Sequence, residues 1–205
     1  GIMLWTWLSI MSPHRYTYGF AFSAPVALMA ALAIVVGAAM TQDRESPFKG
    51  SPVVWFILFL GWMTISWLFG LDVAGDYEQW KKIMKIDFML LFSLALLHSK
   101  KHIIALTWVC ALSIAFLGTK GGLFTVATGG AYRVWGPPGT FIGGNNEFAL
   151  ALVMTIPLLR FLQTQVEARL IRHALALSMV LCAAAALGSQ SRGALLAISA
   201  MVVTL

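Results

Sequence analysis

The sequence predicts an all-α fold, a polytopic bundle of transmembrane helices. Of its 205 residues, 60% are hydrophobic and only 11% are charged, whereas a soluble domain carries about 25% charged residues. The apolar residues are gathered into runs separated by short stretches rich in Gly, Pro and charge. Several runs approach the ~20 residues that a helix needs to cross a bilayer. We therefore expect about seven or eight full or partial spans, with the lipid bilayer as a partner.

The apolar runs define the elements in order. A partial span opens the chain at residues 1–10, and an unfinished one begins near residue 193. Complete spans are predicted at residues 20–40, 52–71, 77–98, 102–118, 147–162 and 173–188. Both terminal runs are shorter than a span, so we expect the chain to be the N-terminal portion of a longer protein.

Lysines and arginines sort, by alternate loops, onto two sides of the membrane. One set lies in compact polar stretches typical of cytoplasmic anchors: Arg44, Lys49, Lys100, Lys101, Arg160, Arg169 and Arg172. The other lies beside Gly, Pro, Asn and aromatic residues: Arg15, Lys81, Lys82, Lys85, Lys120, Arg133 and Arg192. Cations are disfavoured on the outer side, and a bound anion is one reason to keep them there. We place the second set outside. Basic loops beside an anionic leaflet account for the net charge of +6, and no nucleic-acid partner is expected.

The longest interruption is GTKGGLFTVATGGAYRVWGPPGTFIGGNN, residues 118–146. Irregular backbone at a membrane face is tolerated where it lines a cavity or binds a ligand, and Lys120 and Arg133 supply positive charge there. Arg133 fits a ligand contact and an interfacial anchor equally well. In the simpler interpretation, Asn145 and Asn146 cap the next helix.

A second basic stretch is DYEQWKKIMKID, residues 76–87. Lys81 and Lys85 are i,i+4 neighbours on one helix face. The stretch fits an interfacial helix along the headgroups, and it also fits the edge of a site for lipid phosphates. Asp87 is expected to pair with a cation or to face the bundle interior.

The stretch GSQSRGALL, residues 188–196, places Arg192 between two apolar runs. The simple interpretation is an arginine at a helix boundary. However, the small neighbours allow close helix approach, and the Ser191 hydroxyl beside a guanidinium suits an oxyanion, because the planar arginine fork binds phosphate bidentately. We expect no metal site: Cys110 and Cys182 lie inside apolar runs and are interpreted as small hydrophobic residues.

Three stretches carry a resemblance to a known family: LWTWLSIMSPHRYTYGFAFSAP, the run from GTKGG to IPLLR, and LGSQSRGALLA. Over nearly the whole chain they resemble exosortase A-associated O-glycosylation ligases, within the O-antigen ligase and polymerase superfamily of bacterial inner membranes. The resemblance implies a GT-C-like helical glycosyltransferase that moves a saccharide from an undecaprenyl-pyrophosphate carrier to an acceptor hydroxyl on the periplasmic face. It implies no cofactor, nucleotide sugar or metal. Residues 1–187 would form the N-terminal membrane domain, and residues 188–205 would begin the ligase core domain.

The resemblance also implies roles for residues. Arg192 matches the arginine of the superfamily's SRGA motif and would neutralise the pyrophosphate leaving group. Further substrate contacts are expected, from sidedness and not from matched positions, at Lys81, Lys85, Lys120, Arg133 and Ser191. The base that activates the acceptor is expected in a periplasmic loop beyond this chain, so we expect these 205 residues alone to be inactive.

Other functions remain open from the sequence. A polysaccharide polymerase would share the fold and the donor and differ only in its acceptor. A transporter or flippase for lipid-linked glycans would need ionisable residues at mid-span and inverted repeats, and no clear repeat is visible. A non-catalytic membrane module that scaffolds polysaccharide synthesis is a third alternative. The acceptor, which could be a glycan, a lipid or a protein, is not specified by the sequence, nor are the sugar and the oligomeric state.

Overall fold

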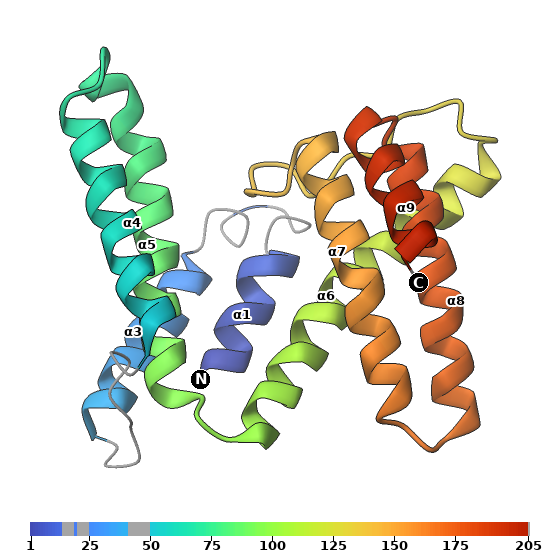
Figure 1. Cartoon of the computed structure of the whole chain (residues 1–205), viewed down its shortest axis with the longest axis horizontal. Helices are drawn as coiled ribbons and strands as arrows, with labels where there is room; N and C mark the ends of the chain where they lie inside the picture. Colours follow the sequence, from blue (N-terminus) through green and yellow to red (C-terminus); the bar gives the residue numbers. More distant parts are fainter. Residues whose placement is uncertain (14–18, 20–24, 41–49, 205) are drawn as a thin grey trace. The chain divides into compact units, whose positions relative to one another are not determined.

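A computed structural model describes residues 1–13, 19, 25–40 and 50–204. Within them the chain is all-helical and has no strand, which confirms the predicted fold class (Figure 1). The helices are α1 (Ile2–Met11), α3 (Val26–Met40), α4 (Ser51–Leu68), α5 (Val73–Leu96), α6 (Lys100–Ala127), α7 (Asn145–Thr164), α8 (Arg169–Gly188) and α9 (Arg192–Thr204). Arg15, Arg44 and Lys49, which entered the sidedness argument, lie outside the described residues.

Three of the described helices, α6, α7 and α8, are long and apolar enough to cross a membrane. Apolar helices at residues 2–11, 26–40, 52–68 and 192–201 are shorter. Helix α5 has 24 residues, but its residues 73–85 include Asp76, Glu78 and three lysines. The coarse prediction of apolar helices that fit a bilayer is confirmed, and the count of seven or eight spans stays a prediction.

The long glycine-rich interruption is shorter than predicted. Helix α6 continues to Ala127, although the sequence predicts a span that ends at residue 118. The expectation of irregular backbone is therefore wrong for the first third of the 118–146 stretch. Within this stretch, residues 128–144 lie outside a helix.

Close helix packing explains why α6 contains glycines that the sequence suggested were loop residues. A Cβ atom at Gly122 would overlap the backbone carbonyl of Leu181 on α8. A Cβ atom at Gly121 would lie 3.2 Å from Cβ of Ala185, also on α8. Small residues let helix backbones approach closely in membrane bundles, so these glycines are contacts between helices.

The structure divides into two compact units. Unit 1 comprises residues 1–2 and 30–103, and unit 2 comprises residues 3–29 and 104–205. In unit 1, α4 and α5 pack as an antiparallel hairpin. Trp67 stacks on Trp80 with ring centroids 4.4 Å apart, and the Trp80 indole nitrogen donates to Thr64 Oγ1 at 3.4 Å. The Asp72 side chain caps α5 by accepting from the Gly75 backbone nitrogen at 2.8 Å.

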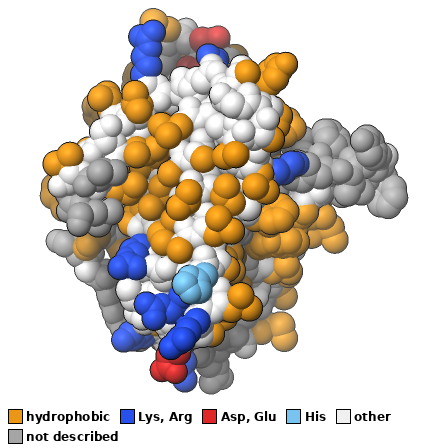
Figure 2. Space-filling model, turned by 90° about the vertical axis from the view of Figure 1, so that its right-hand side faces the viewer, with side chains coloured by type: hydrophobic (Ala, Val, Ile, Leu, Met, Phe, Trp, Pro, Cys, Tyr) orange, Lys and Arg blue, Asp and Glu red, His pale blue; other side chains and the backbone are white. Residues whose placement is uncertain are grey.

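Unit 2 holds the larger core. Helix α7 packs against α8 and α9, and its Phe148, Leu152 and Leu159 are almost completely buried. Cys182 of α8 is a free, fully buried thiol in this core, as its interpretation as a small hydrophobic residue predicts. Other apolar side chains of α8 and α9 remain exposed, including Leu196 at 71%. Figure 2 views the molecule from the right-hand side of Figure 1, and orange apolar side chains are spread over the middle of that face, as expected of a surface that meets lipid.

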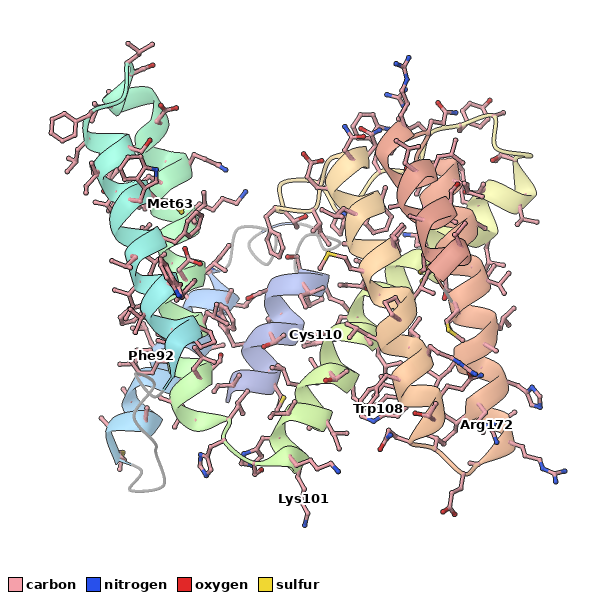
Figure 3. The ribbon with its side chains drawn as sticks, viewed as in Figure 1. Met63, Phe92, Lys101, Trp108, Cys110 and Arg172 are labelled. Atoms are coloured by element: carbon pink, nitrogen blue, oxygen red, sulfur yellow. The ribbon has the colours of Figure 1, made fainter. Side chains whose placement is uncertain are left out.

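The direction of the helices decides which residues of unit 2 share an end. Gly118 of α6 faces Cys182 of α8, and further along both helices Thr125 of α6 faces Gly188 of α8, so α6 and α8 run parallel. Helix α7 runs in the opposite direction (Figure 1). One end therefore gathers the 128–144 loop, the start of α7 and the α8–α9 turn. The opposite end carries the α7–α8 loop and Arg172, which is labelled in Figure 3.

Candidate polar site at the α8–α9 turn

The end of α8 has every backbone acceptor in use. Three of its last carbonyls are satisfied locally: Ser189 N donates to Ala185 O at 2.9 Å, Gln190 N donates to Leu187 O at 3.0 Å, and the Ser189 hydroxyl donates to Ala186 O at 2.6 Å. The last four carbonyls of a helix have no partner within it. The Ser189 hydroxyl, which is fully buried, therefore acts as part of the helix cap.

Two further acceptors are satisfied by segments far away in the sequence. Val134 N donates to Gly188 O at 3.0 Å. The side chain of Asn145 donates through Nδ2 to Ser189 O at 3.1 Å, across 44 residues. These bonds join the loop after α6 and the first residue of α7 to the turn that precedes Arg192.

The turn itself reverses the chain at Gln190. This residue has φ +56°, a conformation that residues other than Gly rarely adopt. Its side chain donates through Nε2 to Gly130 O at 3.3 Å. The loop after α6 therefore contacts the turn at two points.

Ser191 lies between the turn and α9 and is buried, with 9% of its surface exposed. Its backbone nitrogen donates to Ser189 Oγ at 3.2 Å, and its hydroxyl oxygen accepts from Ala194 N at 3.4 Å. The hydroxyl thus caps the start of α9. The predicted role of Ser191 in substrate binding stays a prediction, and the hydroxyl hydrogen is the atom that could serve it.

Arg192 is the first residue of α9, and its side chain is exposed. Among the residues that the structure describes, its guanidinium forms no hydrogen bond or ion pair. The start of a helix is the positive end of its dipole, where a cation is disfavoured and an anion is favoured. A rigid backbone therefore presents a cation that a bound anion would stabilise.

Arg133 belongs to the same end of unit 2. It is exposed, with its guanidinium carbon 5.8 Å from the centre of the Trp135 ring. The bond from Val134 to Gly188 holds it beside the turn. Lys120 is also exposed but lies in α6, seven residues before Ala127, which is about 10 Å along the helix axis. The structure thus brings Arg133 and Arg192 to one end, with Lys120 two turns inside it.

The two other predicted cations lie in unit 1. Lys81 pairs with Glu78 at 3.4 Å, and its Nζ lies 5.4 Å from the centre of the Tyr77 ring. Lys85 is exposed on the same helix. Their participation in a site with Arg192 stays a prediction.

Sequence reasoning missed two residues of this site. Asn145 was expected to cap α7, but the N-cap is Gly144, which has no side-chain cap bond, and the Asn145 amide bonds to Ser189 instead. Gln190 lies in the GSQSRGALL stretch that the sequence singles out, but nothing there predicts the bond from its side chain to Gly130 O. Of the two expectations for Asp87, pairing with a cation is not found within the described part of the chain, whereas its buried Oδ2, which has no hydrogen-bond partner, fits the expectation that it faces the interior.

The described residues contain no group of three or more His, Cys, Asp or Glu that could hold a metal ion.

The fold defines a class: an all-helical protein with three described helices able to cross a membrane. The chain belongs to the family of unknown function DUF5935, which matches it over residues 1–165. No curated protein and no solved structure matches the chain significantly. Arg133 and Asn145 fall within the matched residues, and Arg192 lies beyond them.

Proposed function

We propose that this chain supplies the donor-binding part of a glycan ligase of the bacterial inner membrane. The enzyme would transfer a saccharide from an undecaprenyl-pyrophosphate carrier to an acceptor hydroxyl on the periplasmic face. The proposal includes a GT-C-like arrangement of about seven or eight full or partial spans. It also includes the α8–α9 end of unit 2 facing the periplasm.

One observation carries the proposal: Arg192 is exposed and lacks a partner among the described residues, directly after a turn in which the carbonyls of Gly188 and Ser189 and the backbone nitrogen of Ser191 are all hydrogen-bonded. Groups that are fixed before the ligand arrives need little reorganisation on binding, so they stabilise developing charge best. Arg133, held at the same end by Val134, supplies a second cation for an anion with two phosphates.

The chemistry assigns each group a role. The acceptor hydroxyl attacks the anomeric carbon, the bond from that carbon to the pyrophosphate oxygen breaks, and the electron pair leaves with undecaprenyl pyrophosphate. Arg192 would stabilise the charge that develops on this leaving group, a contribution whose loss costs about 10²–10³ in rate. The proton of the acceptor hydroxyl passes to a base that is neither Arg192, Arg133 nor Ser191. A polymerase would use the same donor site with a growing glycan as acceptor.

The test is the binding of undecaprenyl pyrophosphate to the full 205-residue chain in phosphatidylcholine nanodiscs. We expect Arg192→Ala to weaken binding about tenfold or more, and Arg192→Lys to recover only part of it, because an ammonium cannot form the bidentate fork. Arg172→Ala, an exposed arginine at the opposite end of unit 2, is the matched control and should bind as the unmodified chain does.

Undecaprenol, which lacks phosphate, should not compete. The proposal fails if the chain does not bind the pyrophosphate, or if the Arg192 and Arg172 variants lose the same affinity.

A further inference from the structure

We infer that Asn145 and Gln190 are positioning residues, whose side-chain amides fix the turn that carries Arg192 and so set where its guanidinium meets a lipid pyrophosphate. The inference rests on the proposed function and adds residues to it that no motif indicates. Neither amide touches the anion. Asn145 bonds to the backbone carbonyl of Ser189, and Gln190, which itself lies in the turn before Arg192, bonds to the carbonyl of Gly130.

The bond from Asn145 satisfies a buried acceptor in the turn. Ser189 is completely buried, so its carbonyl cannot obtain a hydrogen bond from water, and Asn145 Nδ2 is its donor at 3.1 Å. A buried acceptor without a partner is costly, and a turn relieves that cost by moving. Loss of the Asn145 amide therefore shifts the segment from Ser189 to Arg192.

The backbone of Gln190 adopts an unfavourable conformation, which the bond from its side chain supports. A φ of +56° is unfavourable for a residue with a Cβ atom, and such conformations persist where the surroundings over-determine them. The bond from Gln190 Nε2 to Gly130 O holds the reversal against the loop that also carries Arg133. This contact therefore couples the two cations of the site.

The contacts that pack α7 on α8 are separate from the bonds that hold the turn. Helix α7 packs on α8 through buried side chains that lie about one helical turn or more from Asn145 and Gln190 along the helices, such as Phe148, Leu152 and Cys182. Those contacts remain when either amide is removed. We therefore expect the helices to stay packed while the turn becomes mobile, so that ligand binding suffers more than folding.

The experiment is a double-mutant cycle on the full chain in phosphatidylcholine nanodiscs, with undecaprenyl pyrophosphate as the probe. Asn145→Ala should weaken binding about tenfold, as loss of a group that orients a ligand-binding residue does. Asn146→Ala, at the exposed neighbouring position, is the matched control and should change affinity less than about twofold.

The decisive readout is the background of Arg192→Ala. If Asn145 acts through Arg192, Asn145→Ala has no further effect there, because the two changes are coupled. An equal loss in both backgrounds would show a merely structural role and would overturn the inference.

Gln190→Gly provides a second variant that does not depend on the fate of Asn145→Ala. Glycine adopts the same positive φ without strain, so this change removes the amide and keeps the turn accessible. We expect weaker binding that is again lost in the Arg192→Ala background. If the unmodified chain does not bind the pyrophosphate, the proposed function and this inference fall together. If it binds and depends on Arg192 while both amide variants bind normally, only the inference is wrong.

Discussion

Replacement of Gly122 by alanine tests the packing that holds the candidate site together. The added Cβ atom would overlap the backbone carbonyl of Leu181, and a backbone atom cannot rotate away as a side chain can. Helices α6 and α8 must therefore separate. Overpacking of this kind costs about 3 kcal/mol at the upper end of its usual range, while the higher helix propensity of alanine returns about 1 kcal/mol. The expected net loss is about 2 kcal/mol.

Thermal unfolding in detergent measures this loss. For a chain of this size, about 2 kcal/mol lowers the Tm by about 4–8 °C. Gly61→Ala is the matched control, because Gly61 lies in α4 with no atom within 4 Å of the added Cβ. That variant should be as stable as the unmodified chain or slightly more stable. If Gly122→Ala melted at or above the temperature of the unmodified chain, the close approach of α6 and α8 would be refuted.

Two further changes test local contacts of the two units. Ser191→Ala removes the cap of α9 and should lower the free energy of unfolding by about 1 kcal/mol, measured by the same melting assay. Ser191→Thr keeps a hydroxyl and should retain most of the stability of the unmodified chain. An equal loss of stability in both variants would show that the hydroxyl does not cap the helix. Trp80→Ala removes the ring stacked on Trp67 and should cost about 1 kcal/mol beyond the lost apolar burial. The indole fluorescence should shift to longer wavelength as Trp67 becomes exposed, and an unchanged spectrum would contradict the stacked arrangement.

The sequence predicts the helices well because the pattern of apolar runs survives in the structure. The predicted span at 173–188 corresponds to α8 (Arg169–Gly188), and the predicted start near 193 corresponds to α9 at Arg192. Helices are local, so composition and the ends of apolar runs are enough to locate them.

The end of α6 was missed for a physical reason. Glycine lowers helix propensity in an isolated chain, so the GTKGG stretch suggested a loop. In the structure the same glycines allow α6 to approach α8, and tertiary packing overrides the local preference. The sequence of α6 alone does not show that a neighbouring helix approaches too closely for a side chain at these positions.

The candidate site was predicted in part. Arg192 and Arg133 were selected from small and aromatic neighbours, and the structure places both at one end of unit 2. The bonds that hold the turn join residues 44 and 60 positions apart, and a single sequence contains no signal for such pairs. Asn145 illustrates the problem, because a residue at the start of a helix looks like its cap whether its amide bonds to that helix or to another.

The most direct test of the account is photo-crosslinking of the chain in nanodiscs with an undecaprenyl-pyrophosphate analogue whose reactive group lies beside the phosphates. Mapping of the labelled peptides by mass spectrometry would locate the phosphates on the chain. The account predicts labels within residues 128–135 and 188–192, lost in Arg192→Ala and prevented by excess unlabelled pyrophosphate. Specific labelling confined to the α7–α8 loop and to the start of α8, which carries Arg169 and Arg172, would place the phosphates at the opposite end of unit 2 and would contradict the proposed donor site.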